Sequence, residues 1–324
     1  MKIKIAIAAL LAFFMGTAGA AQKLTIADQY GLPYLLFTIA KEKKLIESQA
    51  RAAGVELDIE WRQVPGGPEI MAAILSGSID IGAGGISPVL TMWDKTSGLD
   101  NIRAIIALSA APSLLVANRA DIKTVEDFKP TDRIAVPGVK VSGQARYLQM
   151  AAVKAFGKNN WQKLDDLTVS MPHPEAANAL ISGKTEIVAH MSSAPFQNEE
   201  LNHPHTHIVF SSYDVLGAGA TSAVAFTSQR FRTENPVVYA AFVTAIIQAS
   251  EFVKNNPTEA ATIFRTATKS RLSTDEILNI INDKDYNFDT RPSHTFELAS
   301  FLHEIGAIAK KPSSDRDYFF DPVQ

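Results

Sequence analysis

The sequence predicts an α/β protein of two lobes, each built on a doubly wound, mostly parallel sheet and joined by two hinge crossings. The strongest indication is an internal echo, because AILSGSIDIGAGGISP at residues 73–88 returns as ALISGKTEIVAHMSSAP at residues 179–195. Each copy passes from an apolar helix end through Ser-Gly, where glycine can close the helix, into a short strand and a proline. Strand and helix patterns also alternate along residues 23–108, as in parallel sheets. Finally, 324 residues exceed what one hydrophobic core usually serves.

The first 20 residues have the features of a secretory signal peptide. Lys2 and Lys4 precede an apolar stretch at residues 5–15, and Ala18-Gly19-Ala20 supplies the small-x-small pattern that signal peptidase cleaves. The stretch is too short to anchor the chain in a membrane. We therefore expect export, cleavage near Ala21 and a mature protein in the periplasm.

Composition excludes several classes of protein. The chain has no cysteine, which rules out disulfides, thiolate metal sites, a cysteine nucleophile and a lipid-bearing cysteine. Its 34 acidic side chains outnumber 31 basic ones, so nothing in the charge balance attracts nucleic acid or anionic lipid. After the signal segment we expect no apolar run long enough to span a bilayer. The pattern is typical of a soluble globular monomer, and no cofactor is expected.

Residues 21–113 are predicted to form the first part of lobe 1. Pro33 fits the first turn of a helix that follows an initial strand, and residues 55–64 alternate apolar and polar positions as a half-buried strand does. The expected strands are 23–27, 55–64, 81–83 and 102–108, and the expected helices are 33–44, 69–75 and the segment after Pro88.

Residues 114–215 repeat this rhythm and are predicted to form lobe 2. Ser142 is a good N-cap for the helix that ends near Gly157. The expected strands are 114–118, 134–136, 167–171, 187–189 and 208–212, and the expected helices are 125–128, 142–157 and 174–181.

Residues 216–324 are predicted to return to lobe 1. A strand at 223–227 follows a glycine-rich passage at 215–221, and the remainder is helical. A helical tail after two α/β units indicates that both chain ends build lobe 1, with connections near residues 111–115 and 213–224. The expected helices are 236–255, 257–267, 274–283 and 293–308.

Several segments resemble one family of solute receptors. LSGSIDIG at residues 75–82, continuing through Gly85 to Pro88, is similar to the L-x-G-x-x-D-hydrophobic-Gly … Gly-x-x-Pro segment of periplasmic substrate-binding proteins of the nitrate/sulfonate/taurine and thiamine-precursor ABC transporter family. Residues 114–116, 134–137 and 234–236 also look like that family. The resemblance covers most of the mature chain. It implies the type II periplasmic-binding-protein fold, which closes on a ligand and delivers it to a permease driven by a cytoplasmic ATPase.

Two turns of lobe 1 are expected to contact a ligand. In the resembling family the turn after the first strand faces the ligand, and its tyrosines can stack on a planar group; the alternative is a pair of core tyrosines. Gly84 and Gly85 expose backbone N–H groups at a helix N-terminus, which favours anions; the alternative is a tight turn with no ligand. The candidates in lobe 1 are Gln29, Tyr30, Tyr34, Gly85, Ile86, Ser87 and Ser109.

Lobe 2 offers a matching helix start and one histidine. Residues 138–143 have the spacing of a phosphate loop, but Gln144 stands where such a loop has lysine. His190 occupies the echo position of Gly84, so we expect it on the cleft loop, where it can donate a hydrogen bond to an anionic headgroup; a solvated loop histidine is the alternative. The candidates in lobe 2 are Ser142, Gly143, Gln144, His190, Met191 and Tyr213.

A histidine cluster raises the question of a metal. On an extended strand His203, His205 and His207 would share a face, a spacing that can hold zinc or copper. Pro204 and the polar flanking residues indicate a surface loop instead. The sequence leaves the cluster open, and we expect no metal.

These observations predict a binding protein without catalysis that closes on a small organic anion with a sulfonate or carboxylate headgroup. Residues 85–89 begin like a hydrolase nucleophile elbow but lack its final glycine. Fungal enzymes of this fold that make the thiamine pyrimidine have a cysteine-rich segment that this chain lacks. One alternative ligand is a thiamine or pyrimidine precursor stacked on Tyr30, Tyr34, Trp93 and Tyr213, although Trp93 also fits core packing. Another alternative is a receptor that feeds a sensor protein.

Overall fold

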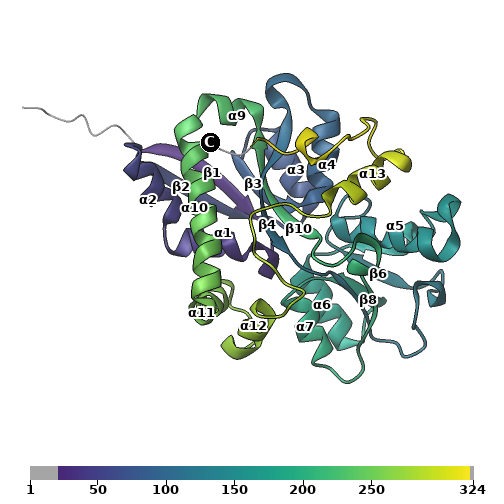
Figure 1. Ribbon diagram of the computed structural model, residues 1–324. Coiled ribbons are helices and arrows are strands. Elements are labelled where there is room, and N and C mark those ends of the chain that lie inside the picture. Colours follow the sequence, from purple (N-terminus) through teal and green to yellow (C-terminus); the bar gives the residue numbers. More distant parts are fainter. Residues whose placement is uncertain (1–20, 322–324) are drawn as a thin grey trace, which may run out of the picture.

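The computed structural model describes residues 21–321 and contains two five-stranded sheets, one in each lobe (Figure 1). The first sheet has the order β2-β1-β3-β10-β4 and the second the order β7-β6-β8-β5-β9. The first sheet consists of β1 (Gln22–Asp28), β2 (Leu57–Gln63), β3 (Ile81–Gly85), β4 (Ile102–Ala110) and β10 (Thr221–Ser228). The second consists of β5 (Leu114–Ala117), β6 (Arg133–Val136), β7 (Thr168–Ser170), β8 (Ile187–Ser192) and β9 (His207–Ser211).

Helices surround both sheets, and the α/β class with two lobes is confirmed (Figure 1). In chain order the α-helices are α1 (Leu35–Glu42), α2 (Leu45–Ala52), α3 (Gly67–Leu75), α4 (Ile86–Lys95), α5 (Gly143–Phe156), α6 (His173–Ser182), α7 (Phe196–Leu201), α8 (Tyr213–Leu216), α9 (Gln229–Glu234), α10 (Pro236–Asn255), α11 (Pro257–Thr268), α12 (Thr274–Ile281) and α13 (Thr295–Glu304). The predicted signal segment lies outside the described residues.

The sheets are mixed rather than mostly parallel. In lobe 1, β10 runs antiparallel to both β3 and β4, and in lobe 2, β5 runs antiparallel to both β8 and β9. The physical reason is the path of the chain, because β5 and β10 follow the two connections between the sheets. Each of these strands starts at the side of its sheet where the neighbouring strands have their carboxyl ends, so it must run antiparallel to them.

The echo corresponds to equivalent parts of the two sheets. The strands of the two copies, β3 and β8, hold the same central place in their sheets, β3 between β1 and β10 and β8 between β6 and β5. Gly77 and Gly183 close the preceding helices with positive φ angles of 71° and 60°. The copies differ after the strand, because α4 begins at Ile86 whereas β8 continues to Ser192 before α7.

One helix is longer and more apolar than the rest. Within the described residues α10 has the length and composition to cross a membrane, contrary to the sequence expectation, and 44% of its apolar window is buried. It packs against α1, α2 and α11 of lobe 1. Phe242 of α10 meets Phe37 of α1 edge to face, with ring centroids 5.7 Å apart. The buried side of the helix is thus part of the lobe 1 core.

The C-terminal segment adds an edge to the first sheet that sequence patterns did not predict. The backbone N–H of Ala104 in β4 donates to the carbonyl of Tyr318, and the N–H of Phe320 donates to the carbonyl of Ala104. Tyr318 is fully buried and packs edge to face on Trp93, with centroids 5.8 Å apart. Trp93 is therefore a core residue and is not available for stacking on a ligand.

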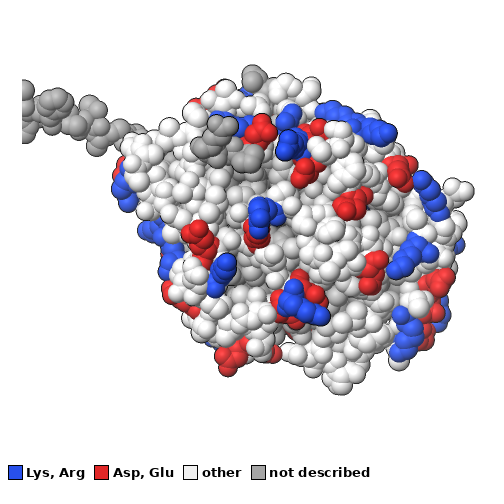
Figure 2. Space-filling view, in the orientation of Figure 1, with Lys and Arg blue, Asp and Glu red and all other residues white. Residues whose placement is uncertain are grey.

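Charged side chains are distributed without a dominant sign on the visible face of the molecule. Figure 2 shows acidic and basic residues interspersed over both lobes in the orientation of Figure 1. Many are paired locally, as in the ion pair between Arg51 and Glu56.

We predict that the two echo glycines are required for backbone conformation. Gly77→Ala and Gly183→Ala should each lower the free energy of unfolding by about 1 kcal/mol, because a side chain disfavours the left-handed region. An added methyl group meets no atom at either position, so a clash does not contribute. Urea denaturation measures the effect, and asparagine, which tolerates this region, should cost less. Equal losses for alanine and asparagine would contradict the explanation.

Candidate ligand-binding site

The loops that follow the strands of both sheets meet between the lobes, where two adjoining cavities lie. The inner cavity has a volume of about 30 Å³ and is lined by both lobes. The outer cavity has a volume of about 520 Å³. The turn after β1 separates them, because Gln29, Tyr30 and Tyr34 line both.

Two helices start at the inner cavity, one from each lobe. Gly85 precedes α4, and a Cβ atom added to it would lie 3.9 Å from the backbone nitrogen of Gly143 at the start of α5. Ser142 caps α5 as predicted, since its Oγ accepts a hydrogen bond from the N–H of Ala145 at 3.2 Å. The positive ends of both helix dipoles therefore converge on one small space.

Seven of the residues predicted from the sequence line the inner cavity. They are Gln29, Tyr30, Tyr34, Gly85, Ser142, Gly143 and Gln144. Their role in binding stays a prediction, but the structure brings these loops of the two lobes together. Sequence reasoning missed other lining residues, among them Ser113, Tyr147, His173, Ser193 and Ser222.

The other candidates of lobe 1 lie behind the cavity wall. Ile86 is buried in the hydrophobic core. Ser87 is fully buried, and its Oγ donates to the carbonyl of Val141 at 3.0 Å. Ser109 is also buried, with its Oγ 2.8 Å from that of Ser222. These hydroxyls are used in bonds within the protein.

In lobe 2 the predicted position of His190 is wrong. β8 extends three residues past its predicted end at Ala189, so His190 lies within the sheet, fully buried, instead of on a loop. The same extension places Met191 in the core. Tyr213 lines neither cavity, since its hydroxyl donates to the carbonyl of Asp285 at 2.8 Å.

His190 belongs to a buried chain of three titratable side chains. Its Nδ1 lies 2.5 Å from Oε1 of Glu200, and its Nε2 lies 2.8 Å from Nδ1 of His173. Burial lowers the pKa of both rings and raises the pKa of the Glu200 carboxyl well above its usual range. His173 starts α6 and lines the inner cavity. The sequence contained one signal for this residue, because His173 stands between two prolines immediately after the strand predicted at residues 167–171.

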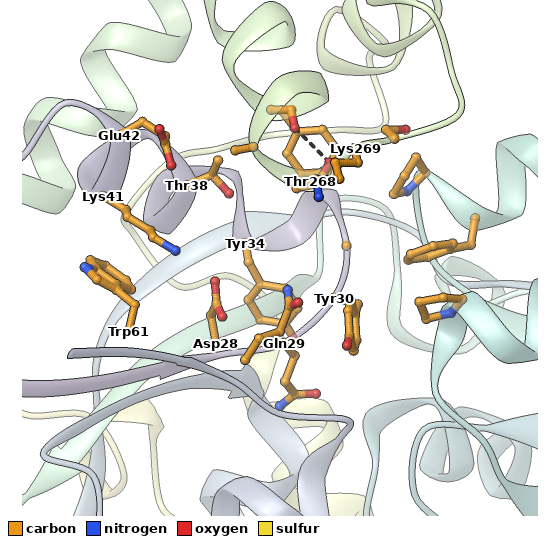
Figure 3. A pocket seen from close by; sticks show the side chains of 18 of the residues that line it. Asp28, Gln29, Tyr30, Tyr34, Thr38, Lys41, Glu42, Trp61, Thr268 and Lys269 are labelled. Carbon is orange, nitrogen blue, oxygen red and sulfur yellow. Dashed lines mark hydrogen bonds between the residues drawn. The ribbon is translucent and has the colours of Figure 1, made fainter.

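The outer cavity has a charged and aromatic lining. Figure 3 shows Asp28, Lys41 and Trp61 around it, with the Nζ of Lys41 5.8 Å from the centre of the Trp61 ring. Burial raises the pKa of Asp28 to about 6, against the opposing effect of the Lys41 charge. Arg62, Lys269, Arg271, Glu42 and Glu199 supply further charges. Sequence patterns could not assemble this lining, because its residues are spread from position 28 to position 271.

The histidines of the surface cluster form hydrogen bonds with different parts of the protein. His205 and His207 lie beside different backbone carbonyls, those of Ile181 and Ile122, at 3.2 and 2.6 Å. Across residues 21–321 no three histidine, aspartate or glutamate side chains form a group that could hold a metal ion.

Comparison with known proteins identifies related sequences and folds. The family model described as NMT1/THI5 like matches residues 31–260. A putative aliphatic sulfonates-binding protein of Escherichia coli (strain K12) is 31% identical over 130 residues, a match that spans 39% of this chain and 39% of that relative.

Solved structures share the fold over nearly the whole chain. The periplasmic aliphatic sulphonate binding protein SsuA of Escherichia coli has a TM-score of 0.67 at 20% identity, covering 94% of both chains. The alkanesulfonate-binding protein SsuA of Xanthomonas axonopodis pv. citri, bound to MOPS, has a TM-score of 0.70 at 17% identity, covering 89% of this chain and 93% of that one. The periplasmic nitrate-binding protein NrtA of Synechocystis PCC 6803 has a TM-score of 0.69 at 12% identity, covering 92% of this chain and 84% of that one.

We predict that Asp28 makes stability depend on pH. Its pKa of about 6 in the folded state lies above the ordinary value of 3.8. Its contribution to the free energy of unfolding is therefore fully present below pH 3.8 and is lost as pH rises to about 6. Asp28→Asn should therefore gain about 1 to 3 kcal/mol over the parent between pH 4 and pH 7. Denaturation at both pH values measures this, with Asp58→Asn on exposed β2 as the control. A constant difference between parent and Asp28→Asn would refute the prediction.

Proposed function

The chain belongs to the NMT1/THI5-like family, and on that premise we propose that it is the periplasmic solute-binding component of an ABC uptake transporter. The family resemblance predicted from the sequence is confirmed. The relatives named above are binding proteins, which supports a role in binding without catalysis. In this proposal the chain is exported, stays monomeric, and passes its ligand to a transmembrane permease with a cytoplasmic ATPase.

We propose a small organic anion as the ligand. The observation that carries this proposal is the convergence of α4 and α5, whose N-termini come from opposite lobes and meet at the inner cavity. Free backbone N–H groups and helix dipoles favour a sulfonate or carboxylate there without a basic side chain. The organic part would occupy the outer cavity, where four basic side chains face three acidic ones.

A planar heterocycle, such as a thiamine or pyrimidine precursor, is the second candidate. Tyr30, Trp61 and Phe196 line the outer cavity and offer aromatic faces for stacking. These faces differ from the set expected from the sequence, which included the core residue Trp93 and the hydrogen-bonded Tyr213. The outer cavity would then bind the ring, and the inner cavity would bind a polar substituent.

Binding requires the lobes to separate and close again. The inner cavity of about 30 Å³ has the volume of one water molecule, so an organic anion cannot enter the conformation described. The lobes touch across it, since the N–H of Leu32 in lobe 1 donates to the carbonyl of Ala194 in lobe 2 at 2.7 Å. The two connections between the sheets are suitable hinges for a rigid-body rotation.

A thermal-shift screen should identify the ligand class. We predict that one class among sulfonates, carboxylates, nitrate and pyrimidines stabilises the protein by about 2.7 kcal/mol at 100 times its dissociation constant. Anions should give the shift if the helix N-termini bind the headgroup. A shift with pyrimidines alone would favour the second candidate, and no shift with any class would contradict both.

We predict that Gly66→Ala weakens binding by preventing closure. Gly66 has an extended backbone that any residue adopts, but an added methyl group would overlap the carbonyl oxygen of Pro137 in the other lobe. Affinity should fall tenfold or more with little loss of stability. With saturating ligand, small-angle scattering should give a larger radius of gyration than for the parent.

Gly77→Ala is the control for this experiment. Its methyl group lies in lobe 1 and meets no atom of lobe 2, so the variant should lose stability and keep affinity. Unchanged affinity in Gly66→Ala would show that ligand binding does not need the contact between Gly66 and Pro137.

A further inference from the structure

The buried chain of His173, His190 and Glu200 connects the interior of lobe 2 to the inner cavity. Glu200 comes from α7, His190 from β8 and His173 from the start of α6. The outer nitrogen of the chain, Nε2 of His173, lies 3.3 Å from Oγ of Ser193 and 3.4 Å from Nε2 of Gln144. Since Ser193 and Gln144 both line the inner cavity, this nitrogen faces the space proposed for the headgroup.

The number of protons shared by Glu200, His190 and His173 decides which atom donates and which accepts in each hydrogen bond between them. With three protons, Nε2–H of His190 donates to Nδ1 of His173. The single proton of the neutral His173 ring is then on Nε2, which donates toward the cavity. This holds whether the third proton sits on Glu200 or on Nδ1 of His190. With two protons, the Glu200 carboxylate accepts from Nδ1–H of His190, Nε2 of His190 accepts from Nδ1–H of His173, and Nε2 of His173 becomes an acceptor.

Burial favours the form with three protons. That form has no net charge, whereas loss of one proton leaves a net negative charge on side chains that are at most 5% exposed. Within residues 21–321 the only ion-pair partner of Glu200 is His190. The residues that pair with His190 on β5 and β6 are the uncharged Val116 and Ala135.

Other titratable groups near the chain do not supply a compensating cation. On α7 the neighbouring charge is Glu199, which lines the outer cavity with Arg271. The titratable residues that line the inner cavity, besides His173, are Tyr30, Tyr34 and Tyr147. Burial raises the pKa of Tyr34 and Tyr147, so both remain neutral donors or acceptors there.

We propose that His173 selects an anionic headgroup through this chain of protons. While the chain holds three protons, His173 presents a hydrogen-bond donor to the anion. After loss of one proton it presents a lone pair backed by a buried negative charge, and the anion is rejected. This inference rests on the proposed function as a receptor for an organic anion, and it assigns His173 as a specificity-determining residue with His190 and Glu200 as positioning residues.

The test measures the affinity for ethanesulfonate between pH 5 and pH 9, since this probe keeps its charge over that range. The dissociation constant should be constant at low pH and rise up to tenfold for each pH unit above the pKa of the chain. In that upper range, binding should take up as much as one proton. Calorimetry in buffers of different ionisation enthalpy measures the uptake.

Two matched variants separate the chain from general charge effects. In Glu200→Gln the amide can donate to Nδ1 of His190, which keeps the direction of the three-proton form without a titrating group. This variant should bind ethanesulfonate with an affinity that does not depend on pH. Glu175→Gln makes the same change at an exposed position of α6 and should keep the pH profile of the parent. A flat profile in the parent, or the parent's profile in Glu200→Gln, would overturn the proposal.

Nitrogen NMR on histidine-labelled protein tests the chain without a ligand. In the parent, His173 and His190 should exchange their protonated nitrogens together at one shared pKa, and in Glu200→Gln neither should exchange. Separate conversion of each ring to imidazolium at ordinary pH would overturn the inference. If ethanesulfonate fails to bind at any pH while the two rings exchange their protons together, the proposed anion-binding function is refuted. The inference that His173, His190 and Glu200 share protons is then still supported.

Discussion

The path of the chain between the two sheets is the constraint on which the rest of the structure depends. One connection leads from the end of β4 in lobe 1 to the start of β5 in lobe 2, and the other leads from the end of β9 back to the start of β10. Both β5 and β10 start at the side of their sheet that faces the other lobe. The returning strands therefore run antiparallel to their neighbours, and the carboxyl ends of the other strands face the opposite lobe. Loops that follow parallel strands are thus brought to one interlobe space, as in open α/β sheets that bind ligands at such edges.

This arrangement lets backbone groups define the inner cavity. Gly66, Gly85 and Gly143 lie where the two lobes approach each other, and a side chain on Gly66 would prevent the approach. The N-termini of α4 and α5 consequently reach the cavity from opposite sides. Of the two cavities, only the outer one is lined by acidic, lysine or arginine side chains, so polarity in the inner cavity comes from helix ends, hydroxyls, the amides of Gln29 and Gln144, and His173. The proposed discrimination by proton position would be favoured there because no acidic, lysine or arginine side chain lines the inner cavity.

Local signals in the sequence predicted most elements and part of the site. The echo located β3 and β8 in equivalent places, and Ser142 was identified as the cap of α5 from its residue type and position. His190 was misplaced because β8 ends without glycine or proline, and a polar residue in the sheet resembles the start of a loop. Its partners His173 and Glu200 satisfy it inside the lobe, and their contact depends on tertiary packing. The antiparallel returns and the pairing of Tyr318 with β4 likewise depend on contacts between distant segments.

The two lobes are joined by hydrogen bonds and by apolar packing, since one hydrophobic cluster contains buried residues of both lobes. Six hydrogen bonds that join side chains or backbone of one lobe to the other are Leu32 to Ala194, Ser87 to Val141, Gln197 to Tyr286, Arg271 to Asn178, Asn202 to Glu276 and Tyr213 to Asp285. Each such bond contributes about 0.5–1.5 kcal/mol, because water replaces it when the lobes separate. Six such bonds contribute about 3–9 kcal/mol together, which is comparable to the differential binding free energy of about 5.5 kcal/mol that moves a two-state equilibrium from mostly open to mostly closed. In the proposed function, a ligand held by both lobes would therefore determine which state is populated.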